Sequence, residues 1–221
     1  MTFTVTLTGD VDQGMTVDFA TSDGTALSAS DYTSGSGTLN FAGTDGETQT
    51  LSVAVSDDDL VEADETFDVT LSNLLAGGRN VSISDATGVG TITNDDLASI
   101  TIADVTVDEE DGTATVSLVL NKAVEGGLTV DLSTADGTAT TTDSDYTALV
   151  SSPVTFAGTI GESHDVNITI GSDSKLEANE TFTVSMSNLT PVTVSSTDID
   201  ITDGATVTIN NDDQATVTIA D

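Results

Sequence analysis

The sequence contains no cysteine and no tryptophan, and only two prolines, two tyrosines and one histidine among 221 residues. Without cysteine there is no disulfide framework and no thiolate metal site. No segment approaches the roughly 20 consecutive apolar residues of a membrane helix, so we expect no direct membrane insertion. Three basic residues stand against 38 acidic ones, a formal net charge of −35. This balance excludes nucleic acid and anionic membranes as electrostatic partners and favours cations.

The acidic residues lie within a repeat that spans nearly the whole chain. The segment D-D-D-L-V-E-A-D-E-T-F-D-V-T-L-S-N at Asp57–Asn73 returns as S-D-S-K-L-E-A-N-E-T-F-T-V-S-M-S-N at Ser172–Asn188. The segment T-V-D-F-A-T-S-D-G-T-A at Thr16–Ala26 returns as T-V-D-L-S-T-A-D-G-T-A at Thr129–Ala139. The offset drifts from 113 to 117 residues along the chain. A period of this length is typical of an independently folding domain and too long for a solenoid repeat.

Apolar and polar residues alternate in both copies, which is the pattern of strands with one buried face. The alternation is clear at Phe3/Val5/Leu7 and at Leu51/Val53/Val55, and the second copy repeats it. Asp-Gly pairs between these segments are turn signals. About seven such strands per copy predict an all-β fold of two tandem immunoglobulin-like antiparallel β-sandwiches.

The repeat also predicts the domain boundaries. Residues 1–97 are expected to form a first repeat that lacks its opening strand, and residues 98–213 a second repeat. The opening segment Ser99–Asp104 of the second repeat returns as Thr216–Asp221, so residues 214–221 are expected to be the first strand of a further repeat. Two interpretations follow: a window of a longer repeat array, or an assembly in which this strand completes the first domain of another copy.

Carboxylates gather at matching positions in both copies, with almost no basic residues nearby. Clustered carboxylates repel one another, and a bound divalent ion neutralises them. A high content of acidic residues can serve solubility or adaptation to salt. This explains the total number of acidic residues but not why they lie at matching positions in both copies. Oxygen ligands without nearby histidine or cysteine favour calcium or magnesium over zinc or copper. The alternative for Glu65 and Glu180 is that they only accept hydrogen bonds where their strands begin.

The succession D-G-T-A, then D-Y, then D-D-D-x-x-E-x-x-E-x-F-x-V-x-L-S-N, then D-D resembles the Calx-beta domains of sodium/calcium exchangers and of long bacterial surface proteins. The resemblance covers both copies and implies a seven-strand immunoglobulin-like sandwich, with Ca²⁺ bound by loops at one end in some members. In the first copy it implies the ligands Asp31, Asp57, Asp58, Glu62, Glu65, Asp95 and Asp96. In the second copy it implies Glu109, Asp145, Asp173, Glu177, Glu180, Asp212 and Asp213.

The second copy departs from this pattern. Ser172, Ser174 and Asn179 stand where the first copy has aspartates. Because calcium affinity rises with the number of carboxylate ligands, we predict weaker or fewer calcium sites in the second copy.

No catalytic constellation is evident. His164 has no counterpart in the first copy, and we expect it to be a solvated loop residue. Nothing singles out a serine for a triad, and glycosidase chemistry needs a cleft with aromatic platforms that this composition does not supply. We therefore predict that the chain is not an enzyme. The rings of Tyr32 and Tyr146 are expected to pack at the edge of each sandwich, with their hydroxyls bonded to backbone.

These observations predict a calcium-binding structural or adhesive repeat module of a long extracellular or cell-surface bacterial protein. Calcium ions would stiffen the domain junctions, and the partners would be neighbouring repeats of the same chain or other copies of it. Two alternatives are a calcium-sensing regulatory domain pair and a filament subunit that assembles by strand complementation.

Overall fold

The computed structural model describes residues 1–220 of the chain. The chain divides into two compact units: the first comprises Met1–Asp58 and Asp64–Asn94, and the second comprises Asp59–Ala63 and the chain from Asp95 onward. Within the described residues, helix is limited to two 3-10 turns, η1 (Glu109–Asp111) and η2 (Ser196–Asp198), so the predicted all-β class is confirmed. No helix in this part of the chain is long and apolar enough to cross a membrane.

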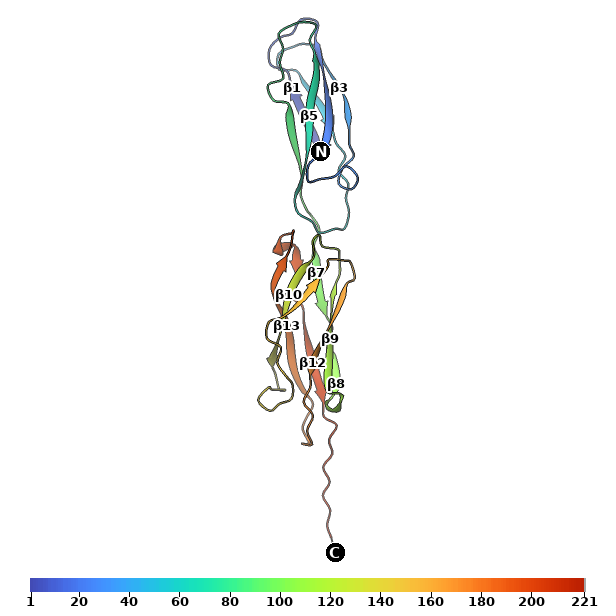
Figure 1. Ribbon diagram of the computed structural model, residues 1–221, viewed down its shortest axis with the longest axis vertical. Helices are drawn as coiled ribbons and strands as arrows, with labels where there is room; N and C mark the ends of the chain where they lie inside the picture. Colours follow the sequence, from blue (N-terminus) through green and yellow to red (C-terminus); the bar gives the residue numbers. More distant parts are fainter. Residues whose placement is uncertain (221) are drawn as a thin grey trace. The chain divides into compact units, whose positions relative to one another are not determined.

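The first unit is a sandwich of two antiparallel sheets (Figure 1). One sheet pairs β1 with β4, and the other has the strand order β3-β2-β5-β6. Its strands are β1 (Thr2–Thr6), β2 (Met15–Asp23), β3 (Ser36–Phe41), β4 (Thr48–Ser52), β5 (Glu65–Leu75) and β6 (Thr87–Ile92). Alternate side chains of both sheets meet in one core, where Leu51 of β4 and Val17 of β2 join the fully buried Phe67 of β5.

The second unit has a sheet of order β11-β10-β13-β15-β8 and a sheet of order β12-β9-β7-β14. The first of these sheets contains β8 (Val105–Asp108), β10 (Leu128–Asp136), β11 (Ser152–Phe156), β13 (Glu180–Pro191) and β15 (Gly204–Asn210). The second contains β7 (Ala98–Ile102), β9 (Thr113–Leu120), β12 (Ser163–Thr169) and β14 (Ile199–Asp200). Val61, from the segment Asp59–Ala63, is fully buried in the core of this unit, and its N–H donates to the Ala123 carbonyl at 3.0 Å.

The two tyrosines form the same buried contact in each unit. Tyr32 stacks on Phe67 with 4.4 Å between ring centroids, and Tyr146 stacks on its equivalent phenylalanine at 4.0 Å. Each hydroxyl donates to a carboxylate, Tyr32 to Asp23 and Tyr146 to Asp136, both at 2.6 Å. The prediction of a backbone partner was therefore wrong. The aspartates of the D-G-T-A motif supply the acceptor that a buried hydroxyl requires.

His164 is not a loop residue, so that prediction was also wrong. It lies in β12, where its Nε2 is 2.8 Å from Oε1 of Glu162 and its ring meets the edge of Phe156. Burial opposes ionisation of Glu162, but the N–H of Ala157, His164 and further backbone N–H groups lower its pKa to about 2. The histidine therefore helps to hold a turn before β12.

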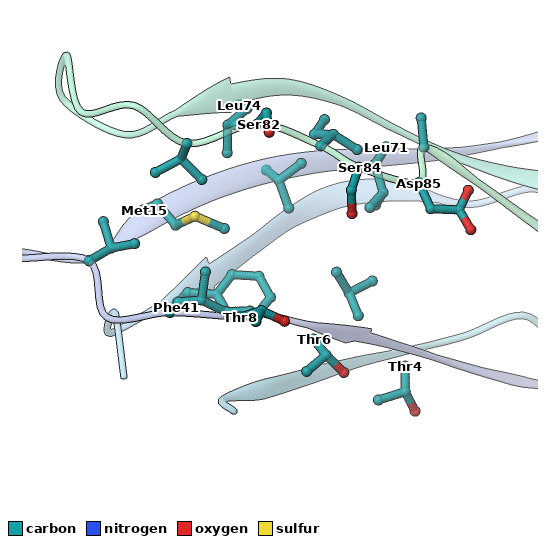
Figure 2. A pocket seen from close by; sticks show the side chains of 18 of the residues that line it. Thr4, Thr6, Thr8, Met15, Phe41, Leu71, Leu74, Ser82, Ser84 and Asp85 are labelled. Atoms are coloured by element: carbon teal, nitrogen blue, oxygen red, sulfur yellow. The ribbon is translucent and has the colours of Figure 1, made fainter. Parts of the chain in front are cut away.

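The first unit has an open groove of about 820 Å³ on one side of β1 (Figure 2). Leu71 and Leu74 of β5 line it together with Phe41 of β3, and Ser82, Ser84 and Asp85 line its other wall. It lies apart from the acidic loops described below, because none of the clustered carboxylates contributes to its lining.

Candidate metal centre

Carboxylates converge in the second unit at two adjoining groups. The first, called the buried group, consists of Glu109 in η1, Asp173 after β12 and Asp213 after β15, and offers oxygens that all lie within 4.8 Å of one another. Glu109 is only 7% exposed, and its Oε1 accepts the Asp173 N–H at 2.9 Å. Within the described chain, Asp213 Oδ2 is buried without a hydrogen-bond partner. A buried carboxylate oxygen without a donor is free to coordinate a cation.

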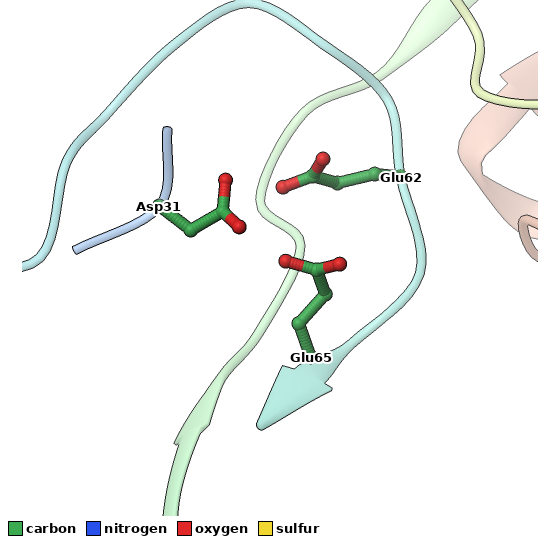
Figure 3. A group of neighbouring side chains, drawn as sticks. All are labelled: Asp31, Glu62 and Glu65. Atoms are coloured by element: carbon green, nitrogen blue, oxygen red, sulfur yellow. The ribbon is translucent and has the colours of Figure 1, made fainter. Parts of the chain in front are cut away.

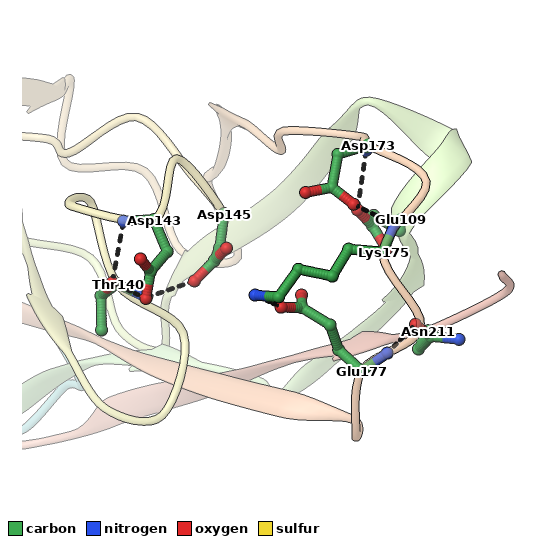
Figure 4. Close-up of polar contacts among 8 residues, drawn as sticks. All are labelled: Glu109, Thr140, Asp143, Asp145, Asp173, Lys175, Glu177 and Asn211. Carbon is green, nitrogen blue, oxygen red and sulfur yellow. Dashed lines mark hydrogen bonds and ion pairs between the residues drawn. The ribbon is translucent and has the colours of Figure 1, made fainter.

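The second group is called the strand-entry group, because its last member is the first residue of a long strand. In the second unit it consists of Asp145, Glu177 and Glu180, again with oxygens within 4.8 Å of one another (Figure 4 shows the first two). Asp145 is held in place by the Thr140 N–H, which donates to Oδ2 at 2.7 Å. The Nζ of Lys175 forms an ion pair with Glu177.

A small pocket joins the two groups. It has a volume of about 10 Å³, and its walls include Glu109 of the buried group and Asp145, Glu177 and Glu180 of the strand-entry group. A space of about 10–15 Å³ holds one water-sized sphere. The pocket therefore has room for one small ion between oxygens and no room for an organic ligand.

The electrostatics of these groups disfavour their charged state. Burial raises the pKa of Glu109, and the negative charges of Asp173, Asp213 and Asp212 raise it further. Burial likewise raises the pKa of Glu180, with Asp145 and Glu177 adding to the effect. Raised carboxyl pKa values of this kind mark sites where a cation would relieve repulsion.

The first repeat contains an equivalent strand-entry group. Asp31, Glu62 and Glu65 have carboxylate oxygens within 4.8 Å of one another, and their side chains point toward one another in Figure 3. Asp31 is 8% exposed, and its Oδ2 accepts the Leu27 N–H at 2.6 Å. Burial works to raise the pKa of Asp31, but hydrogen bonds, first that from Leu27, leave it below the ordinary value.

All nine residues of these groups were among the fourteen predicted ligands. Their role as ligands stays a prediction. Five predicted residues lie outside the three groups found within the described chain: Asp57, Asp58, Asp95, Asp96 and Asp212. Asp96 instead pairs with Lys122, whose Nζ is 2.8 Å from both Asp96 and Asp59. The ion pairs of Lys122 and Lys175 with these acids were not predictable from the sequence, because the reach of a long side chain depends on loop geometry.

The family model of the Calx-beta domain matches the chain twice, over residues 1–104 and 92–221. The chain belongs to the Calx-beta family. Sodium/calcium exchanger 1 of Bos taurus is 40% identical over 106 residues, which cover 47% of this chain and 10% of that protein. The same exchanger of Mus musculus is 49% identical over 67 residues, covering 30% of this chain and 7% of that protein. The chain thus spans a tenth or less of these curated relatives.

Solved structures of Calx-beta domains resemble the chain as well. The apo-form Calx CBD1 domain matches with a TM-score of 0.46 and 22% identity over 53% of this chain and 100% of that chain. The CBD12 structure from CALX1.2 matches with a TM-score of 0.43 and 20% identity over 95% of this chain and 93% of that chain. With the two family matches, the predicted resemblance to tandem Calx-beta domains is confirmed.

The raised carboxyl pKa values predict an unusual pH dependence for the second Calx-beta repeat. In chelator, lowering the pH from 7 toward the ordinary glutamate value of 4.5 should raise its melting temperature. A carboxyl group whose pKa is higher in the folded than in the unfolded state stabilises the fold at pH values below its unfolded pKa. That stability is lost as the pH rises through the folded pKa. Thermal melting followed by circular dichroism measures this. Melting temperatures that fall over this interval would contradict the prediction.

Proposed function

We propose that the two Calx-beta repeats bind Ca²⁺ through the acidic groups of their loops. The observation that supports this most directly is the recurrence of the strand-entry group: three carboxylates converge within 4.8 Å at equivalent positions of both repeats. In the second repeat, burial and then the charges of Asp145 and Glu177 raise the pKa of Glu180, so the fully charged group costs stability there. A dication that binds the folded state offsets that cost by linkage.

The residues present fit calcium. Every side chain in the three groups is a carboxylate, and calcium takes six to eight oxygen ligands, some from backbone carbonyls and water. The sole histidine is engaged at Glu162, so nitrogen ligands do not compete. Bound calcium would supply positive charge, while the chain orients the oxygens: backbone N–H groups hold Asp31, Asp145 and Glu109. The sodium/calcium exchangers that resemble the chain carry calcium in their name.

The proposed setting is a long bacterial protein at the cell surface or in the medium, where the repeats serve as structural or adhesive spacers. A net charge of −35 suits a salty, calcium-rich medium that screens self-repulsion. The absence of cysteine leaves folding independent of the redox compartment. Asp95 and Asp96 precede β7 by only a few residues, so we propose that calcium bound near them stiffens the junction. The proposed partners are calcium, neighbouring repeats and other copies of the chain.

A calcium-sensing domain pair is the second candidate. It is favoured by the identity of 40% over 106 residues to sodium/calcium exchanger 1. A sensor needs sites tuned to intracellular calcium, with micromolar dissociation constants, whereas a structural spacer in the medium works with near-millimolar ones. The affinity therefore separates the two candidates.

Calorimetric titration with CaCl₂ tests the proposal. We expect saturable binding to the wild-type chain, and an affinity about 2- to 5-fold higher at the second repeat in Lys175→Gln. The ammonium group of Lys175 neutralises Glu177, and the ion must displace it before that carboxylate can coordinate.

The matched control is Arg79→Gln, which removes the same charge at the groove of the first unit, where Arg79 donates to the Ala76 carbonyl at 2.7 Å. It should leave the calcium affinity of the groups unchanged. Absence of saturable binding up to millimolar calcium would remove the proposed function altogether.

A further inference from the structure

The D-G-T-A motif opens the loop that carries the first carboxylate of each strand-entry group. Its aspartate is Asp23, the last residue of β2, in the first repeat and Asp136, the last residue of β10, in the second. The same loops lead to Asp31 and Asp145. Neither Asp23 nor Asp136 belongs to the three acidic groups found in the described chain. The motif therefore lies beside the candidate ligands without being one of them.

In the first repeat the aspartate of the motif ties the loop down at two points. Oδ1 of Asp23 accepts the Ser28 N–H at 2.9 Å and the Tyr32 hydroxyl at 2.6 Å. The preceding N–H, that of Leu27, donates to Oδ2 of Asp31 at 2.6 Å. Two successive N–H groups are thus divided between Asp23 and the candidate ligand. Because peptide units are planar, fixing one N–H restricts the direction of the next, so Asp23 helps to orient Asp31.

The second repeat has the same arrangement. Oδ1 of Asp136 accepts the Tyr146 hydroxyl at 2.6 Å and the Thr141 N–H at 3.1 Å. The preceding N–H, that of Thr140, donates to Oδ2 of Asp145 at 2.7 Å (Figure 4). The residue types at the two donor positions differ between the repeats. The arrangement is therefore set by the backbone and the aspartate, and not by the side chains of the donors.

The remaining residues of the motif hold the other end of the strand-entry group. In the first repeat, Thr25 Oγ1 accepts the Thr66 N–H at 2.8 Å, and the Ala26 N–H donates to the Thr66 carbonyl at 2.9 Å. Thr66 directly follows Glu65, the first residue of β5. A Cβ at Gly24 would lie 2.4 Å from the Thr66 carbonyl oxygen, so this close approach requires glycine.

The second repeat holds its long strand in the same way. Thr138 Oγ1 accepts the Thr181 N–H at 2.8 Å, and the Ala139 N–H donates to the Thr181 carbonyl at 3.0 Å. Thr181 directly follows Glu180, the first residue of β13. A Cβ at Gly137 would lie 2.3 Å from the Thr181 carbonyl oxygen. Each motif therefore contacts the chain next to two of the three carboxylates of its group.

We propose that the D-G-T-A motif is the positioning element of each strand-entry group. Its aspartate orients Asp31 or Asp145, and its threonine and alanine fix the strand start that carries Glu65 or Glu180. The motif itself does not contact the ion. Preorganised ligands bind more tightly, because less conformational freedom is lost on binding. The inference rests on the proposed calcium binding and assigns part of its affinity to residues outside the acidic groups.

Calorimetric titration of the 221-residue chain with CaCl₂ tests the aspartate. Asp136→Ala should weaken calcium binding at the second repeat about 5- to 10-fold, the equivalent of one hydrogen bond. Asp136→Asn should stay within about 2-fold of the wild type, because its amide oxygen still accepts both donors and salt screens an exposed charge. A role through the charge of Asp136 would instead make the asparagine variant as weak as the alanine variant.

Asp131→Ala is the matched control. Asp131 also lies in β10 and accepts the side-chain amide of Asn188 at 3.0 Å, but it holds no residue of the loop. Its removal should leave the calcium affinity unchanged. Asp136→Ala also takes the acceptor from the Tyr146 hydroxyl, so the titration is repeated in Tyr146→Phe, where Asp136→Ala should cause the same weakening. A purely structural role would lower the melting temperature in chelator without changing the affinity.

The threonine of the motif has its own test. Thr138→Val removes the acceptor of the Thr181 N–H and should weaken calcium binding at the second repeat about 5-fold, whereas Thr138→Ser keeps the hydroxyl and should restore it. Wild-type affinity in both Asp136→Ala and Thr138→Val overturns the inference and leaves the proposed calcium binding intact. Absence of calcium binding to the wild-type chain removes both.

Discussion

Saturating calcium is expected to raise the melting temperature of each Calx-beta repeat by roughly 10 to 20 °C over chelator. An ion that binds only the folded state contributes about 2.7 kcal/mol at 100-fold excess over its dissociation constant, and 1 kcal/mol shifts a domain of this size by about 4 to 8 °C. The second repeat carries both a buried group and a strand-entry group, so its shift should be the larger. Differential scanning calorimetry resolves the two transitions.

Paired variants assign the effect to the strand-entry group of the first repeat. Asp31→Asn combined with Glu62→Gln should remove the calcium-dependent shift of that repeat, because two of its three converging carboxylates are neutralised. The control is Asp10→Asn with Asp12→Asn, which removes the same charge from an exposed loop of the same repeat and should keep the shift. An unchanged melting curve for the wild type in calcium would contradict the prediction at once.

The fold was predictable from the sequence because apolar and polar residues alternate along a strand when one of its faces is buried in the core. Phe67 and Phe182 lie at equivalent points of the repeated motif, and both are fully buried in long strands, β5 and β13. The partner of a buried hydroxyl was not predictable in this way. Tyr32 finds the carboxylate of Asp23, nine residues earlier in the chain, because the turn after β2 brings the two together. This contact depends on the folded turn, and no periodic pattern in the sequence indicates it.

The acidic groups were predictable as a set but not in their arrangement. The repeat placed carboxylates in the right loops, and the structure divides those of the second repeat into two groups that share a pocket. The weaker binding predicted for the second copy from its serine and asparagine replacements is untested, and the larger calcium shift expected above for the second repeat opposes it. That prediction considered only the carboxylates that the second copy lacks. In the structure, Glu109 adds a buried group to the second repeat, and Lys175 neutralises part of its strand-entry group.

Glu109→Gln is expected to change stability in opposite directions with and without calcium. In chelator the amide removes a buried charge whose pKa is already raised, so the second repeat should melt a few degrees higher. The amide oxygen can still accept the Asp173 N–H, so the loop keeps its anchor. In saturating calcium the same variant should lose roughly 10 °C or more of the calcium-dependent shift, because the buried group keeps only two carboxylates.

The neighbouring Glu110→Gln is the matched control, since Glu110 is exposed on the same 3-10 turn and belongs to none of the three groups. It should change the melting temperature little in either buffer. A purely structural role for Glu109, as an acceptor for the Asp173 N–H, gives a different result: Glu109→Gln would then shift both buffers equally. Opposite signs in the two buffers therefore require that the charge of Glu109, and not its hydrogen bond, is what calcium neutralises.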